Sequence, residues 1–401
     1  MKILMIAPTP FFSHRGCHVR IYEEARALQR LGHEVKICTY HNGDGVPDVT
    51  VERTVRIRWY KKREAGPSLH KFYLDILLLL KVFIILKDFK PDILHAHLHE
   101  GAFIAWIVRS MTRKPFVFDY QGSLTEEITA HGFIRAKGFL HSLACRAERF
   151  IEKRANHIIT SSMSSGERLA RVHSGKPIAV DTVADGVDTE CFRRNGGRPV
   201  IRRKHGIPDD APVIVYLGLL DEYQGTPNLL RAMRHVLDIV PECRLLVGGY
   251  PNEARYQAMA DDLGVGERVI FTGRVDYRTA ADFLSAGDVA VAPKLSQTEA
   301  NGKLLNYMAC SLPCVCYDSP SNREILGDSG VYVNGNDERG LADAMVRLLA
   351  NPSLARQLGD AARSRAIKEH GWHERAARIT TAYEMVLSTG GTLAPAVPYK
   401  A

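Results

Sequence analysis

The residues with the clearest chemical potential lie in one short segment, Gly302-Lys303-Leu304, which opens a predicted amphipathic helix before an apolar strand. A glycine directly before a lysine-led helix leaves backbone N–H groups and an ammonium at the helix N-terminus. We expect these amides and the Lys303 side chain to form a diphosphate-binding site. The alternative is an ordinary helix start with a solvated lysine, because one short motif often arises by chance.

Three histidines, His95, His97 and His99, alternate where a predicted strand gives way to a loop. Strand side chains alternate between faces, so the three share a face if the extended conformation continues. Zinc is one interpretation, but neither a cysteine nor a further histidine follows at ligand spacing. We therefore expect no metal ion, and we expect His95 to be hydrogen-bonded inside the core.

Short apolar runs alternate with helical periodicity along the chain, which is typical of parallel sheets covered by helices. The predicted strands of the first half lie at residues 2–7, 34–39, 91–96 and 116–119. Those of the second half lie at residues 213–217, 244–248, 269–272, 289–292 and 313–317. The sequence therefore predicts an α/β protein with two doubly wound, Rossmann-like domains. The carboxyl ends of their strands should face each other across a cleft.

The domain boundary is expected in the polar stretch near residues 186–200. We expect an N-terminal domain over residues 1–190 and a C-terminal domain over residues 191–370. A last helix over residues 371–388 should pack back toward the N-terminal domain. Residues 389–401, rich in Gly, Pro and Thr, should form a flexible tail.

The 401-residue chain has a net charge of +8, and its basic excess lies in the first half. Residues 1–185 hold 28 Lys and Arg against 19 Asp and Glu, and several of the basic residues precede the apolar segment 72–86. That segment is short for a membrane span, which needs about 20 residues. It is either a core helix after a solvated basic loop or an interfacial helix that docks on anionic lipid. No secretory signal is apparent, so we expect a cytoplasmic protein, peripheral at the inner membrane face if the helix is interfacial, and no nucleic-acid partner.

Several short motifs occur in order along nearly the whole chain. They are Arg15-Gly16, Leu31-Gly32-His33-Glu34-Val35, Asp185-Gly186-Val187-Asp188, Phe271-Thr272-Gly273-Arg274-Val275, Ser285-Ala286-Gly287-Asp288 and Met308-Ala309-Cys310-Ser311-Leu312-Pro313. This series resembles family 4 of the glycosyltransferases. The resemblance implies the two-domain GT-B fold.

The resemblance also implies an activity. Such enzymes transfer a sugar from a nucleoside-diphosphate donor to a glycan, lipid-linked or small-molecule acceptor, with retention of anomeric configuration. We expect the donor here to be a UDP- or GDP-linked sugar. The implied donor site lies mainly on the C-terminal domain and needs neither a metal nor another cofactor. Negative charge builds on the departing diphosphate, which the predicted site at Lys303 would stabilise.

By the same resemblance, His97 contacts the donor sugar near the reacting carbon, and Arg274 and Val275 lie by the nucleobase. Gly16 should let a phosphate approach the backbone closely. The other expected donor-side residues are Gly218, Gln224, Thr298, Asn301, Gly302, Leu304 and Asn306. The polar loop after residues 116–119 indicates an acceptor side with Gln121, Gly122 and Glu126.

The chain departs from the family's two-glutamate signature. The two carboxylate positions fall on Thr298 and Asn306, and Glu299 comes one residue late. We expect Glu299 to reach the sugar through a one-residue shift of its loop, with an exposed loop carboxylate as the alternative. Asn306 can still hydrogen-bond ribose hydroxyls through its amide.

A second departure concerns the diphosphate. The family's usual Arg and Lys in the first loop of the C-terminal domain are replaced here by an apolar residue and Gln224. Lys303 should take over their role, with Lys294 or Arg323 as further cations. Two other functions stay open on these grounds: a catalytically weak GT-B protein that binds a nucleotide sugar or glycan as a partner subunit, and a sugar-nucleotide epimerase of the same fold.

Overall fold

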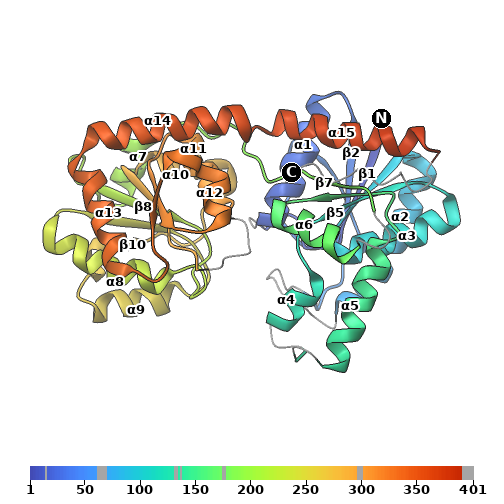
Figure 1. Ribbon diagram of the computed structural model, residues 1–401, viewed down its shortest axis with the longest axis horizontal. Coiled ribbons are helices and arrows are strands. Elements are labelled where there is room, and N and C mark those ends of the chain that lie inside the picture. Colours follow the sequence, from blue (N-terminus) through green and yellow to red (C-terminus); the bar gives the residue numbers. More distant parts are fainter. Residues whose placement is uncertain are drawn as a thin grey trace. The chain divides into compact units, whose positions relative to one another are not determined.

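The computed structural model describes residues 1–13, 16–60, 70–130, 134–135, 138–173, 178–295 and 301–390. The chain forms two compact units, and the division falls between Asp185 and Gly186 rather than at residue 190. The N-terminal unit comprises Met1–Asp185 and Trp372–Ala401, and the C-terminal unit comprises Gly186–Gly371. Both are parallel sheets with helices packed on them (Figure 1).

The sheet of the N-terminal unit has the order β3-β2-β1-β4-β5-β6-β7, with all neighbours parallel. Its strands are β1 (Lys2–Ala7), β2 (Glu34–Thr39), β3 (Thr50–Arg53), β4 (Ile93–His97), β5 (Phe116–Tyr120), β6 (His157–Thr160) and β7 (Val180–Thr182). The helices are α1 (Gly16–Arg30), α2 (Lys71–Phe89), α3 (Leu98–Thr112), α4 (Leu124–Ala130), α5 (Phe139–Glu152), α6 (Met163–Val172) and α15 (Trp372–Ser388). The central strands read as continuous apolar runs because both faces of the sheet are covered.

The sheet of the C-terminal unit has the order β10-β9-β8-β11-β12-β13 and is also parallel. Its strands are β8 (Val213–Leu217), β9 (Arg244–Gly248), β10 (Val269–Phe271), β11 (Val289–Ala292), β12 (Cys314–Tyr317) and β13 (Gly330–Val333). The α-helices are α7 (Gly197–Lys204), α8 (Thr226–Ile239), α9 (Glu253–Asp262), α10 (Ala280–Ser285), α11 (Lys303–Ala309), α12 (Pro320–Leu326), α13 (Glu338–Ala350) and α14 (Pro352–Glu369). In both sheets the strand order reverses beside the first strand, which places the ligand edge at the carboxyl ends of the central strands.

The apolar segment 72–86, which the sequence indicates to be either a core helix or an interfacial helix, lies in helix α2. This helix buries Leu74, Leu78, Val82, Ile85 and Phe89 on one face. The opposite face exposes the stripe Phe72, Ile76, Leu80 and Ile84. Within the described residues, no helix combines the length and the apolar character that crossing a bilayer requires.

Candidate active site

Lys303 is the first residue of α11 and lies half-buried at the carboxyl end of β8. Its Nζ donates hydrogen bonds to Gln224 Oε1 at 2.7 Å and to Tyr216 Oη at 3.1 Å, and it lies 4.5 Å from the Tyr216 ring centroid. Burial and the nearby positive charge of Lys294 lower the pKa of Lys303 well below its usual value. Among the described ion pairs none involves Lys303. This is a cation held by neutral groups, a setting that an incoming anion would complete.

Two glycines give the Lys303 site its shape. A Cβ at Gly218 would lie 2.8 Å from Lys303 Nζ and 3.0 Å from its Cε, so the ammonium packs directly against this glycine. Gly225, before α8, has a φ of 74°, and a Cβ there would lie 1.9 Å from the Pro293 carbonyl oxygen. The second glycine therefore fixes the turn that presents Gln224 to Lys303.

The start of α11 differs from the expectation in one respect. The Leu304 amide donates to the Asn301 carbonyl oxygen at 2.9 Å, so the prediction of a free amide is wrong for Leu304. Asn301 is buried, and its Nδ2 donates to Asn322 Oδ1 at 3.1 Å while its Oδ1 has no hydrogen-bond partner among the described residues. Gly302 and Asn306 are half-buried.

The other residues expected on the donor side each have a separate setting. Arg274 is exposed, with its guanidinium 5.8 Å from the Tyr250 ring centroid, and Val275 packs against Gly248. Of the two alternative cations, Lys294 is buried, and Arg323 forms an exposed ion pair with Asp318 at 2.6 Å. Thr298 and Glu299 lie outside the described residues.

In the N-terminal unit, a buried network surrounds His97 at the end of β4. Its Nδ1 lies 2.9 Å from Asp119 Oδ2, and Arg20 contacts the same carboxylate at 2.8 Å. Arg20 also contacts Glu24 and Asp185, each at 2.9 Å. Arg20 carries no motif in the sequence, because two of its three acidic partners, Asp119 and Asp185, come from distant segments.

The charges of this network set the state of His97. Burial opposes ionisation of Asp119, but the Arg20 guanidinium outweighs it and holds the pKa of Asp119 below its usual range. Burial lowers the pKa of His97 despite its bond to Asp119. His97 is therefore a neutral ring that donates from Nδ1 to Asp119 and keeps Nε2 as an acceptor without a partner among the described residues. His97 is also fully buried in the free chain.

The expectation that three histidines share a face is wrong for His99. The strand ends at His97, and α3 begins at Leu98, whose φ is 62°. His95 and His97 stack with ring centroids 4.5 Å apart, whereas His99 packs against Phe118 and Tyr120. His95 is hydrogen-bonded inside the core, as expected, to the Tyr383 hydroxyl.

The expected acceptor-side residues lie beyond β5. Gln121 is half-buried and donates to Asp119 Oδ2 at 2.6 Å, which joins it to the His97 network. Gly122 is exposed, and Glu126 is an exposed carboxylate 3.5 Å from Arg168. Gly16 is exposed at the first position of α1.

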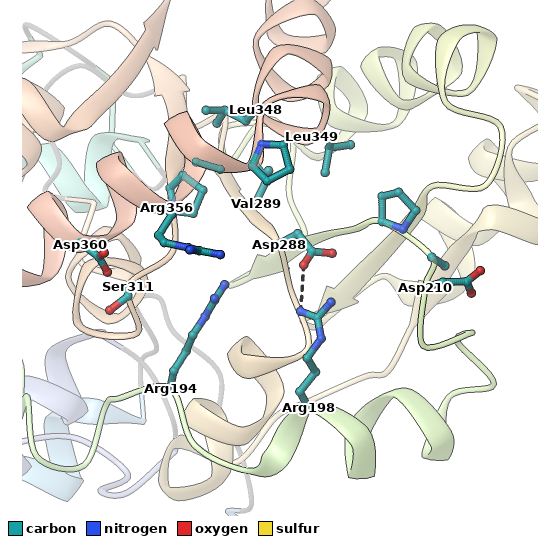
Figure 2. A pocket seen from close by; sticks show the side chains of 15 residues that line it. Arg194, Arg198, Asp210, Asp288, Val289, Ser311, Leu348, Leu349, Arg356 and Asp360 are labelled. Atoms are coloured by element: carbon teal, nitrogen blue, oxygen red, sulfur yellow. Dashed lines mark hydrogen bonds and ion pairs between the residues drawn. The ribbon is translucent and has the colours of Figure 1, made fainter.

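A cavity of about 530 Å³ in the C-terminal unit lies at the opposite sheet edge (Figure 2). Pro212, Asp288 and Pro313 line it directly before β8, β11 and β12, at the amino ends of these strands. Arg194 and Arg356 point toward one another across it, and Arg198 pairs with Asp288 at 2.8 Å. Because ligands of open parallel sheets bind at the carboxyl ends, this cavity is not the candidate active site.

Comparisons with known proteins agree with this architecture. Residues 15–186 match the model "Glycosyl transferase 4-like domain", and residues 197–365 match "Glycosyl transferases group 1". D-inositol 3-phosphate glycosyltransferase of Xylanimonas cellulosilytica is 27% identical over 398 residues, covering 92% of this chain and 91% of that protein. A GDP-mannose-dependent phosphatidylinositol monomannoside mannosyltransferase of Mycolicibacterium smegmatis is 32% identical over 215 residues, covering 51% and 56%.

Solved structures show the same fold. Sucrose-phosphate synthase from Thermosynechococcus elongatus superposes with a TM-score of 0.78 at 19% identity, covering 97% of this chain and 99% of that chain. Anabaena HepE in complex with UDP and glucose gives a TM-score of 0.73 at 15% identity, covering 96% and 99%. The chain therefore belongs to family 4 of the glycosyltransferases and is a glycosyltransferase with the GT-B fold.

Proposed function

We propose that this glycosyltransferase moves a sugar from a nucleoside-diphosphate donor to a glycan, lipid-linked or small-molecule acceptor, with retention of anomeric configuration. The observation that carries the proposal is Lys303, held between Gln224 and Tyr216 against Gly218 at the carboxyl edge of the sheet. A diphosphate there would accept hydrogen bonds from the ammonium. It would also supply an anion, which the described part of the site does not provide.

The chemistry needs charge stabilisation more than a nucleophile. Breaking the bond between the anomeric carbon and phosphate leaves negative charge on the diphosphate, and Lys303 would stabilise it in a partly desolvated site. In the proposed retaining reaction the donor phosphate itself helps to deprotonate an acceptor that arrives on the same face. Neither a carboxylate nucleophile nor a metal ion at the diphosphate is then required. Among relatives, the mannosyltransferase is named as GDP-mannose-dependent and HepE was solved with UDP-glucose, which supports a UDP- or GDP-linked sugar.

His97 is proposed to contact the donor sugar. Because His97 keeps its proton on Nδ1 and donates it in a hydrogen bond to Asp119, Nε2 can accept a hydrogen bond from a sugar hydroxyl. Since His97 is fully buried in the free chain, this contact requires the residues that cover it to move when the donor binds. Gln121, Gly122 and Glu126, beyond the same network, are proposed to face the acceptor.

The test is a calorimetric titration of the purified protein with UDP, GDP, CMP and their common sugar conjugates. One nucleotide class should saturate the protein. Lys303→Ala should weaken the binding of that nucleotide about 10- to 100-fold, because a hydrogen bond to a charged group contributes roughly 1.5–3 kcal/mol. Lys204→Ala, which removes an exposed lysine of α7, is the matched control and should bind like the wild type.

The outcomes separate the alternatives. Unchanged binding by Lys303→Ala contradicts the proposed diphosphate role. Binding of a nucleotide sugar without transfer or hydrolysis favours a catalytically weak partner subunit.

We further propose that the N-terminal unit contacts an anionic membrane surface. On α5 both acidic residues, Glu148 and Glu152, are buried. The exposed face carries Phe139, Leu140 and Leu143, which are 81%, 58% and 52% exposed, beside the basic Arg146 and Arg149. An apolar face flanked by basic residues is suited to the interface of a bilayer.

A flotation assay with liposomes tests this contact. The protein should float with vesicles that contain anionic lipid and much less with neutral ones. Phe139→Asp combined with Leu143→Asp should reduce flotation at least about tenfold. Val200→Asp, at a 66% exposed position of the C-terminal unit, should leave it unchanged. No flotation with either vesicle contradicts the contact.

A further inference from the structure

A second group of ligand-type side chains lies in the N-terminal unit, away from His97. His99 comes from the first turn of α3, and Glu148 and Glu152 lie one turn apart on α5. Their exposed fractions are 3%, 3% and 2%. His99 Nε2 lies 3.4 Å from Glu148 Oε1 and 3.9 Å from Glu152 Oε1. One nitrogen and two carboxylate oxygens thus face a common point inside the unit.

The outer oxygen of each carboxylate is held by a separate group. Thr125 donates to Glu148 Oε2 at 2.8 Å, and His173 lies 2.6 Å from Glu152 Oε2. The inner oxygens are therefore oriented toward His99. Within the part of the chain that the structure describes, neither Glu148 Oε1 nor His99 Nε2 has a hydrogen-bond partner of good geometry. Outer groups that orient carboxylate ligands in this way are typical of metal sites.

Charge distinguishes this group from the one around His97. There, the Arg20 guanidinium lies within 2.9 Å of Asp119 and Glu24 and occupies the place of a cation. In the second group the nearest guanidinium, Arg168, is 3.8 Å from Glu148 and donates to Ser123 at 3.1 Å and to Tyr120. Among the described residues, the two carboxylates therefore have His99 and His173 as their close partners, and a guanidinium only at 3.8 Å. Two buried carboxylates with so little positive charge beside them are costly unless a further counter-ion is bound.

We infer that His99, Glu148 and Glu152 bind a divalent transition-metal ion, with zinc as the representative. Bonds of about 2.0–2.2 Å in tetrahedral geometry place neighbouring ligand atoms roughly 3.3–3.6 Å apart. The two separations from His99 Nε2, 3.4 and 3.9 Å, are close to this range. Imidazole and carboxylate form a ligand set that zinc accepts, and the fourth position is left to solvent.

The ion would tie several elements together. It joins α3 to α5 directly, α4 through Thr125, and the end of α6 through His173. Of these elements, α4, α5 and α6 follow the loop that carries Gln121 and Gly122, and α3 precedes it. Because the ligands belong to the folded unit, binding stabilises it. The role is structural and independent of the proposed donor chemistry.

The test measures metal binding rather than activity. Protein stripped of metal by a chelator is titrated with Zn²⁺ against a chromophoric competitor, and Co²⁺ is added separately to record its visible absorption. We expect one equivalent per chain. Zinc at about 100-fold excess over its Kd should raise the Tm by roughly 5–10 °C. Glu148→Gln combined with Glu152→Gln should lose both the equivalent and the shift.

Three controls keep the result decisive. His157→Gln removes another buried histidine of the same unit, 3.0 Å from Asp181, and should keep the metal. His99→Gln leaves both carboxylates in place and should also lose the metal. It therefore provides the test if the double variant does not fold. A wild-type protein that binds no equivalent overturns the inference. Retention of the metal by the double variant or by His99→Gln also overturns it, and so does loss of the metal in His97→Gln.

Discussion

The ammonium of Lys303 in the C-terminal unit predicts how nucleotide binding depends on pH. Burial and Lys294 lower its pKa in the free protein, and a bound diphosphate would raise it again. Above the lowered pKa, nucleotide binding must therefore take up a proton, so affinity should fall as pH rises, by up to about tenfold per pH unit. Calorimetry in buffers of different ionisation enthalpy measures this uptake. Lys303→Met should abolish the pH dependence, and an affinity that rises with pH contradicts the assignment.

Asp119 should matter for stability as well as for the state of His97. It is buried and shared by Arg20, His97 and Gln121, so Asp119→Asn leaves a buried guanidinium with less compensation. Breaking a buried pair in this way costs roughly 3–5 kcal/mol. Urea unfolding of the N-terminal unit should report the loss. Asp318→Asn, from an exposed pair with Arg323, should leave the midpoint close to that of the wild type, and equal effects of the two variants contradict the prediction.

The sequence could predict some site residues and not others, for a physical reason. Lys303, Gln224 and His97 lie in contiguous motifs that reveal their setting. Arg20 and its partner Asp119 are 99 residues apart, and Asp185 is 165 residues away, so nothing local marks them. Charge partners brought together only by the sheet order cannot be read from spacing.

Among the elements, the turn before α8 depends on one glycine. Gly225→Ala requires a left-handed backbone and places a Cβ 1.9 Å from the Pro293 carbonyl oxygen, so the turn must shift. We expect a loss of about 1–3 kcal/mol in unfolding free energy and weaker nucleotide binding, since Gln224 moves with the turn. Gly206→Ala is matched, with a φ of 63° but no atom within 4 Å. It should cost only about 1 kcal/mol and spare binding. Similar binding by both variants contradicts the role of the turn.

Helix α5 shows why element prediction from periodicity was incomplete. The central strands of both sheets could be predicted, because buried parallel strands are uniformly apolar, whereas β3, β6, β7 and β13 were not predicted. In α5 the buried face carries Glu148 and Glu152, and the exposed face carries Phe139 and Leu143. Because charged residues are buried and apolar residues are exposed on this helix, a prediction that assigns apolar residues to the core does not identify it correctly.

At the scale of the whole molecule, the N-terminal unit is completed by the end of the chain. Helix α15 buries Trp372, Ile379, Tyr383 and Val386 in this unit, and Tyr383 reaches His95. Arg375 donates to the Ala184 carbonyl oxygen at 2.7 Å. Folding of the unit therefore needs contacts between residues far apart in sequence, and its core cannot close before the last helix is present.

Because α15 completes the core of the N-terminal unit, a substitution in this helix should destabilise that unit and not the C-terminal one. Ile379→Ala leaves a cavity in the N-terminal unit and should cost about 2–5 kcal/mol. Hydrogen exchange followed by mass spectrometry should show lost protection in β1, β4 and α1, while peptides of β8 to β13 stay protected. Arg378→Ala, at the adjacent exposed position, should change neither. If protection falls equally in both units, they unfold as one body, and the division at Asp185 does not describe an independent folding unit.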